Sequence, residues 1–197
     1  MNYIQDVDKL YGYMDRIWEI ACKHGFHNEV HSAEHYLGLI LSEVGEAIDA
    51  DRKSVRAKSD EFQEQINSVK LEDVNDRWYG RWYSEYYNKL IKGSIEEEFA
   101  DIVIRILDMA YEVHGKRMYP WKGYDDYGED FKSDRSFVES AWFFVKEKLN
   151  SGTMNISDSV SYMYAWSEYL GIDLDKHIEW KIKYNELRPY RNGGKKY

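Results

Sequence analysis

Four carboxylates stand at helical spacing inside two apolar segments of the chain. Glu43 and Glu46 lie in LILSEVGEAIDADRK, and Glu98 and Asp101 lie in IEEEFADIVIRILD. Residues three apart share one face of an α-helix, so each pair can direct its carboxylates at one place. Burying an unpaired charge is strongly unfavourable. Four acids beside apolar stripes therefore need positive partners.

The types of these residues favour a hard divalent cation as that partner. Oxygen-only ligand sets suit Mg²⁺, Mn²⁺ or Ca²⁺. A di-iron carboxylate site requires Glu-x-x-His on two helices, whereas position 46 is Glu and position 101 is Asp. The nearest histidines, His31 and His35, precede Glu43 by more than a helical turn, and we interpret them as surface groups or groups at a substrate mouth.

The alternative is that the acids are solvated or paired with lysine and arginine, as is usual for a single E-x-x-E on a helix. Two pairs within strong apolar stripes weigh against it. At about 100° per residue, Glu98 falls inside the apolar sector of its helix, and Glu43 and Asp101 flank theirs. Glu46 lies farther round, so we expect it at the rim of the same site.

Three strong helical patterns and the last helix must position these groups. We expect a first helix over about Tyr3 to Lys23, a second capped by Ser32 and ending soon after Arg52, and a third capped by Ser94 and closed by Gly115. Glu97 occupies the capping-box position of the third helix. Further helices are expected at roughly Ser136 to Leu149, at Ser157 to Leu170, and from the N-cap Asp173 towards Pro189.

Two stretches are less regular. The segment from about 54 to 92 has a weak pattern of charged and aromatic residues, which indicates either a helical excursion or a long loop. The stretch KRMYPWKGYDDYGEDFKSD (116–134) is rich in Gly, Tyr and Asp and predicts an irregular connection.

The whole chain fits one all-α domain. It has 197 residues, 43% of them hydrophobic, and only two prolines interrupt it. No stretch approaches the length of a membrane span and the N-terminus lacks a signal core, so we expect a soluble cytoplasmic protein without membrane partners. The net charge of -9 argues against binding of nucleic acid polymers, but not against a phosphate-bearing small molecule. The single cysteine, Cys22, is expected to be a small buried hydrophobic residue.

Three ordered blocks together resemble the all-α NTP pyrophosphohydrolases, and specifically MazG-like proteins. The resemblance covers about Ser32 to Lys53, Ser94 to Ala110 and Leu170 to Tyr197. It implies a helical bundle, usually a homodimer or homotetramer, that hydrolyses a nucleoside triphosphate to a monophosphate and pyrophosphate.

Family motifs in these blocks imply roles for particular residues. The E-x-x-E and E-x-x-D motifs map onto Glu43, Glu46, Glu98 and Asp101 as Mg²⁺ ligands, with Mn²⁺ as a possible substitute. The C-terminal pattern maps onto Lys181, Asn185 and Arg188 as contacts to phosphate and sugar.

The spacing of the last helix supports this mapping independently. Leu174, Ile178, Lys181, Asn185 and Arg188 share one face, so its apolar stripe becomes cationic towards its end. The alternative is a C-terminal helix whose basic residues compensate the helix dipole or extend along the surface.

This chain departs from the family pattern in two respects. Position 42 is Ser where many relatives have a second glutamate, which puts one outer-shell or base role in doubt. The chain also carries two insertions, at about 54–92 and 116–168, within a single NTP pyrophosphohydrolase-like domain of residues 1–197.

We therefore predict a Mg²⁺-dependent (d)NTP pyrophosphohydrolase that acts in nucleotide-pool control or house-cleaning. Glu43 is the predicted catalytic base. Trp18 or an aromatic residue of an insertion is the predicted stacking platform for the nucleobase. The alternative is a non-catalytic helical module that binds a nucleotide or a protein. A third alternative is an enzyme for a related substrate such as phosphoribosyl-ATP.

Overall fold

The computed structural model describes residues 7–69, 75–115, 135–149 and 155–189, and every regular element in them is a helix. This confirms the all-α prediction. In chain order the elements are α1 (Val7–Lys23), α2 (Ala33–Arg52), α3 (Ser59–Ser68), α4 (Asp76–Leu90), α5 (Ile95–His114), α6 (Phe137–Phe143), the π-helical turn η2 (Phe144–Lys148), α7 (Ile156–Tyr169) and α8 (Leu174–Glu186). None of the described helices combines the length and hydropathy needed to cross a bilayer.

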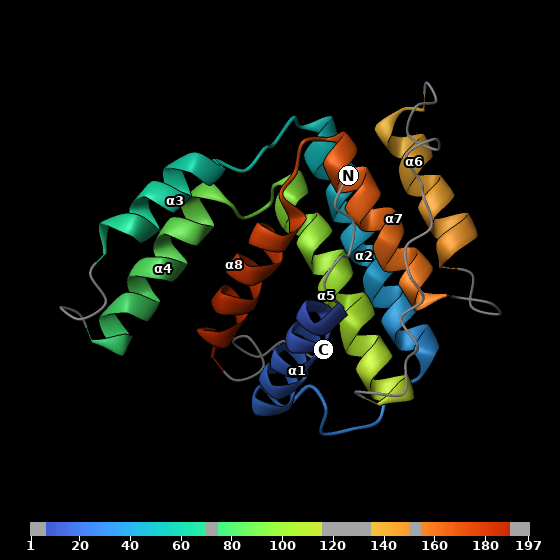
Figure 1. The fold of residues 1–197 in the computed structure, drawn as a ribbon, viewed down its shortest axis with the longest axis horizontal. Coiled ribbons are helices and arrows are strands. Elements are labelled where there is room, and N and C mark those ends of the chain that lie inside the picture. The colour runs from blue at the N-terminus through green and yellow to red at the C-terminus, as the bar shows by residue number, and fades with distance from the viewer. Residues whose placement is uncertain (1–6, 70–74, 116–134, 150–154, 190–197) are drawn as a thin grey trace.

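Helix α5 is the centre of the bundle. It packs against α1, α2, α7 and α8, which surround it in Figure 1. Side chains on several sides of α5 are almost fully inaccessible, among them Phe99, Ile102 and Val103. A helix that is apolar around most of its circumference is stable only when other elements cover it. Any charged group on α5 is consequently placed close to the core.

The expected helix ends are confirmed where they are described. The side chains of Ser32, Ser94 and Asp173 each accept a hydrogen bond from a backbone N–H three residues on, which satisfies donors that the first turn leaves without helical partners. Gly115 follows α5 with φ 69°, a conformation that favours glycine. Helices α6 and α7 occupy the two later predicted segments, and Ser136 forms a capping box with Glu139.

The segment 54–92 forms helices α3 and α4, so the helical alternative for it is confirmed. The two helices lie together beside α8 (Figure 1). They build an aromatic cluster around Phe62, whose ring is within 5.8 Å of the rings of Tyr83, Tyr87 and Trp180, measured between centroids. This cluster is separate from the main core and joins the pair to α8.

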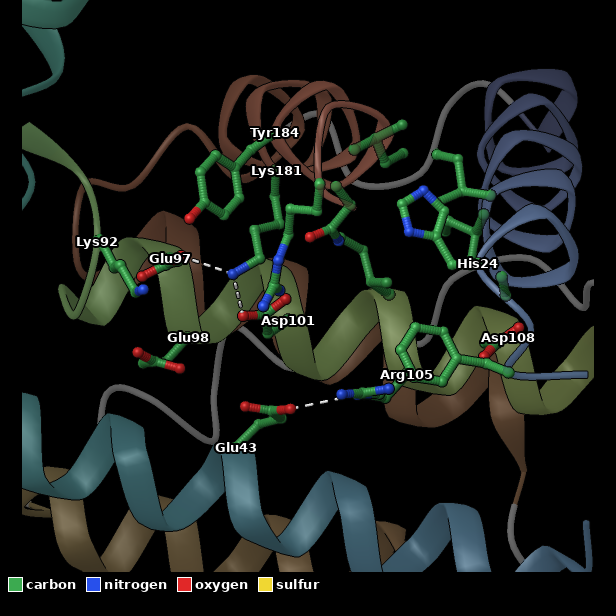
Figure 2. Close-up of a pocket in the computed structure, with 18 of the residues that line it drawn as sticks. His24, Glu43, Lys92, Glu97, Glu98, Asp101, Arg105, Asp108, Lys181 and Tyr184 are labelled. Atoms are coloured by element: carbon green, nitrogen blue, oxygen red, sulfur yellow. Dashed lines mark hydrogen bonds and ion pairs between the residues drawn. The ribbon is translucent and has the colours of Figure 1, made fainter. Parts of the chain in front are cut away.

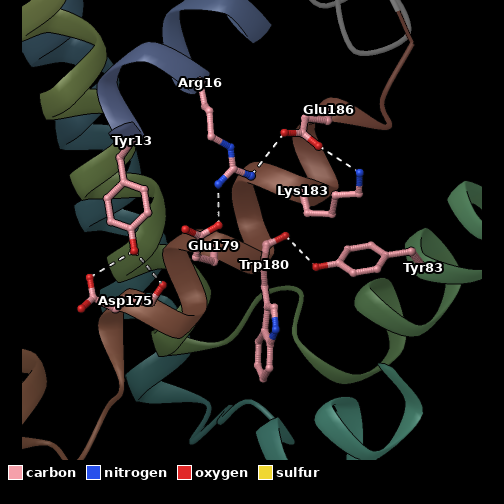
Figure 3. Close-up of polar contacts among 8 residues, drawn as sticks. All are labelled: Tyr13, Arg16, Tyr83, Asp175, Glu179, Trp180, Lys183 and Glu186. Carbon is pink, nitrogen blue, oxygen red and sulfur yellow. Dashed lines mark hydrogen bonds and ion pairs between the residues drawn. The ribbon is translucent and has the colours of Figure 1, made fainter. Parts of the chain in front are cut away.

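Polar contacts hold α8 against α1 on one side and α4 on the other (Figure 3). Arg16 of α1 pairs with Glu179 at 2.5 Å and with Glu186 at 3.3 Å. On the opposite side, the Tyr83 hydroxyl of α4 donates to the Trp180 carbonyl at 3.0 Å. These contacts fix the position of α8 along its length, and with it the basic residues that α8 carries.

The prediction for Cys22 is wrong, because its side chain is exposed. The buried stripe of α1 passes through Ile17 and Ala21, and the next residue points about 100° away from that stripe. The predicted irregular connection at 116–134 and the predicted start of the first helix at Tyr3 lie outside the described residues.

Candidate metal centre

Three of the four predicted ligands converge. Glu43 and Glu46 from α2 and Glu98 from α5 each offer a carboxylate oxygen, and these oxygens lie within 4.8 Å of one another. Their exposure follows the predicted order: Glu98 is buried, Glu43 is intermediate and Glu46 is exposed. The close packing of α2 on α5 brings the two helix faces together. The group has the oxygen-only composition expected of a Mg²⁺ or Mn²⁺ site.

Glu98 is the most perturbed acid of the group. Burial, followed by the charges of Asp101 and Glu97, raises the pKa of Glu98 to about 9. The carboxyl group is therefore protonated near neutral pH unless a cation lies beside it. A bound divalent cation would favour the ionised form. The residues present thus fit a divalent metal ion.

Asp101 lies beside this group and is held by Lys181. The Lys181 ammonium is 2.5 Å from a carboxylate oxygen of Asp101 and 2.5 Å from one of Glu97 (Figure 2). Lys181 is almost completely buried. Burial alone would lower the pKa of Lys181, but Asp101 and Glu97 raise it, so the ammonium stays charged. Asp101 is thus placed at the edge of the carboxylate group and engaged by a cation from α8.

Arg105 of α5 contacts the carboxylate group through Glu43. Its Nε atom donates to a carboxylate oxygen of Glu43 at 3.2 Å (Figure 2). Arg105 lies one turn after Asp101 on α5, so its guanidinium lies across the gap to α2. One oxygen of Glu43 is oriented by this contact.

The centre opens into a cavity of about 230 Å³. The predicted phosphate and sugar contacts, Lys181, Asn185 and Arg188, all line it, together with the carboxylates of α2 and α5. The predicted cationic stripe of α8 therefore faces the predicted acids across one cavity. Its apolar part, Leu174 and Ile178, packs in the core. Such an arrangement can bind a group with several negative charges together with a cation.

The other residues that the sequence analysis singled out lie outside the carboxylate group. Ser42 is exposed on α2. Trp18 is stacked between His27 and Tyr111, with ring centroids 4.0 and 4.4 Å away. His31 and His35 stack on each other at 4.3 Å. They border a small neighbouring pocket that also touches Arg105 and Asp108.

Sequence reasoning missed several polar residues of the cavity wall, among them Glu97, Arg105 and Asp108. The carboxylate of Glu97 accepts from the Gly93 N–H and the Lys181 ammonium, so it does more than occupy a capping position. Arg105 and Asp108 follow Asp101 at intervals of four and three residues. That spacing continues the acid-bearing face of the helix and could have identified both.

Comparison of the chain with models of protein families, with curated proteins and with solved structures found no match.

Proposed function

We propose that this protein is a Mg²⁺-dependent nucleotide pyrophosphohydrolase that converts a (d)NTP and water into a (d)NMP and pyrophosphate. The observation that carries the proposal is one cavity in which Glu43, Glu46 and Glu98 converge opposite the basic residues of α8. The MazG-like order of the sequence motifs supports the same reading. It also supports a cytoplasmic homodimer or homotetramer with the MazG-like fold.

Glu43, Glu46 and Glu98 would hold the metal, and Asp101 would complete the set if Lys181 moved away from it. When bound, Mg²⁺ would neutralise charge on the phosphate oxygens and make a nearby water more acidic. Oxygen-only ligands explain the choice of Mg²⁺ or Mn²⁺ over zinc or iron.

Glu43 is the proposed base. One of its oxygens is held by Arg105, which leaves the other to accept a proton from the attacking water. The water oxygen forms a bond to one of the two phosphorus atoms that flank the α–β bridging oxygen. The bond between that phosphorus and the bridging oxygen breaks, and its electron pair leaves with the departing phosphate group.

The α8 side of the cavity would bind the phosphates. Arg188 presents a planar guanidinium suited to paired hydrogen bonds with phosphate oxygens. Lys181 is already engaged by two carboxylates, so its main effect is to keep Glu97 and Asp101 in place. Lys92, exposed before the start of α5, lies on the same wall.

The test is a panel of canonical and modified NTPs and dNTPs, with phosphoribosyl-ATP added, incubated with Mg²⁺. Separation of monophosphate and pyrophosphate from diphosphate and orthophosphate identifies the bond that is cleaved. We expect monophosphate and pyrophosphate from at least one nucleotide. Glu98→Gln should reduce turnover by a factor of 100 or more, while the matched control Glu19→Gln, on the exposed face of α1, should keep wild-type activity.

Several outcomes would overturn the proposal. Orthophosphate as the only product would exclude pyrophosphohydrolysis. Tight nucleotide binding in Mg²⁺ without turnover, measured by calorimetry, would favour the non-catalytic binding module. A fully active Glu98→Gln variant with an unchanged helical CD spectrum would contradict the proposed metal ligands.

A further inference from the structure

The residues that line the cavity change from charged at one end to largely apolar at the other. Glu98 and Asp101 lie towards one end of the α5 segment in Figure 2, and Asp108 and His24 lie towards the other. Beside this second end the lining is largely apolar, with Ile20, Ala21 and Phe26 of α1 and the turn that follows it. An apolar slot with a few polar groups is typical of a site for a flat, partly polar ligand.

Asp108 is a fixed hydrogen-bond acceptor at this end. One of its oxygens lies 2.9 Å from Nε2 of His27, and the other ring nitrogen of His27 lies 3.0 Å from Glu112. Although burial opposes it, these two carboxylates raise the pKa of His27. His27 is also stacked on Trp18. The ring therefore fixes one oxygen of the Asp108 side chain from behind, and a carboxylate accepts hydrogen bonds but does not donate them.

His24 supplies a second acceptor. Its Nδ1 lies 3.2 Å from the Pro189 carbonyl, and a carbonyl can only accept, so Nδ1 carries the proton. Burial lowers the pKa of His24, which keeps the ring neutral at pH 7. Its Nε2 therefore has a free lone pair. Asp108 and His24 together favour a ligand whose edge carries N–H donors.

The register of α5 relates this end to the carboxylate group. Glu98, Asp101, Arg105 and Asp108 follow one face at intervals of three, four and three residues. A rise of about 1.5 Å per residue separates Asp101 from Asp108 by about 10 Å along the axis. A nucleotide whose phosphates lie beside the acids would extend its ribose past Arg105 and bring its base to Asp108.

We propose that this end of the cavity binds the nucleobase, and that Asp108 accepts a hydrogen bond from an exocyclic amine. The protein would thus prefer nucleotides with amino-bearing bases over those that present a carbonyl at the same place. This inference rests on the proposed function, because it assumes that the phosphates lie beside Glu43, Glu46 and Glu98. Protein carboxylates accept hydrogen bonds from the cytosine amine in complexes with DNA. A base carbonyl at the same place would instead bring a second acceptor against Asp108, and no hydrogen bond could form.

The experiment uses nucleotide pairs in which one exocyclic amine is replaced by a carbonyl: dCTP against dUTP, and dATP against dITP. With the full chain and Mg²⁺, kcat/KM should be at least tenfold higher for dCTP than for dUTP, and at least tenfold higher for dATP than for dITP. Asp108→Asn should bring both ratios close to one, since an amide can donate to a carbonyl as well as accept from an amine. Asp60→Asn, on the exposed surface of α3, is the matched control and should retain the wild-type ratios.

Equal kcat/KM values within both pairs would overturn the base site and leave the proposed hydrolysis standing. If no nucleotide is hydrolysed, the proposed function fails, and Kd values for the same four nucleotides decide the base site. A tenfold preference for dCTP over dUTP and for dATP over dITP supports it, and equal values overturn it. If Asp108→Asn does not fold, His24→Phe replaces it. That variant should lower both ratios, and unchanged ratios would overturn the assignment.

Discussion

Lys181 is the residue on which the charge balance of the cavity most depends. It is 6% exposed and contacts both Glu97 and Asp101. A buried cation is tolerated only when its partners are close, and its removal leaves those partners without compensation. Two carboxylates would then face each other in a site that already holds Glu98.

Lys181→Met is therefore expected to lower the free energy of unfolding by about 3–5 kcal/mol. The matched control is Lys183→Met on the same helix, because Lys183 forms a half-exposed pair with Glu186 at 3.1 Å. Loss of such a surface pair costs about 0.2–1 kcal/mol. Urea unfolding of the three proteins measures both effects. Equal losses in the two variants would contradict the assigned role of Lys181.

His177 makes the fold sensitive to acid. It is buried in α8, where a ring nitrogen lies 3.1 Å from the Ser59 hydroxyl of α3. Burial lowers its pKa from 6.5 to about 4. The unfolded chain therefore binds a proton at higher pH than the folded protein does. Stability supplied by the neutral ring is complete above pH 6.5 and is lost as the pH falls from 6.5 towards 4.

The expected loss from His177 over that interval is about 3 kcal/mol, at about 1.4 kcal/mol per pKa unit. His177→Gln keeps a polar group near Ser59 but cannot take up the proton. Denaturant unfolding at several pH values between 4 and 7 should show a shallower decline for the variant. Parallel curves for the two proteins would show that another group causes the acid sensitivity.

At the scale of elements, α3 and α4 form a support for α8. Phe62 is inaccessible to solvent and lies at the centre of the aromatic cluster. Tyr87 from α4 and Tyr184 from α8 stack at 4.3 Å, and the Lys181 ammonium lies about 6 Å from each ring centroid. The segment that lies between the two acid motifs in the sequence thus packs against the cation that holds Glu97 and Asp101.

Phe62→Ala should loosen this support more than it loosens the main core. A buried Phe→Ala change costs about 3–5 kcal/mol in the cluster that contains it, and a separate cluster can open without global unfolding. Hydrogen exchange should show lost protection in α3 and α4, with protection in the middle of α5 largely retained. A uniform loss across α4 and α5 would mean that the two clusters unfold as one unit.

For the whole molecule, the carboxylate group predicts that Mg²⁺ stabilises the fold. A ligand bound only by the folded state adds about 2.7 kcal/mol at 100 times its Kd. Melting temperature should rise with MgCl₂ and should not rise with NaCl at equal ionic strength. Glu98→Gln should abolish the Mg²⁺ response, whereas Glu19→Gln should retain it. Equal responses to both salts would indicate general screening instead of a site.

Local sequence determined much of the helical framework and its acid-bearing faces. Caps such as Ser32, Ser94 and Asp173 lie where short-range hydrogen bonding favours them, and the three-residue spacing of Glu43 with Glu46 needs only helical geometry. The burial order of the acids also followed from their angle to the apolar stripe. These features depend on contacts within one or two turns of helix, which a sequence pattern contains.

Tertiary structure decided which charges meet. The sequence placed Asp101 with three other acids, but the packing of α8 on α5 brings Lys181 against it. The contacts of Arg105 with Glu43 and of His27 with Asp108 join residues 62 and 81 positions apart. The orientation of one helix on another depends on side-chain packing over the whole interface. That is why spacing could predict a face for each helix, while only the assembled bundle determined its partners.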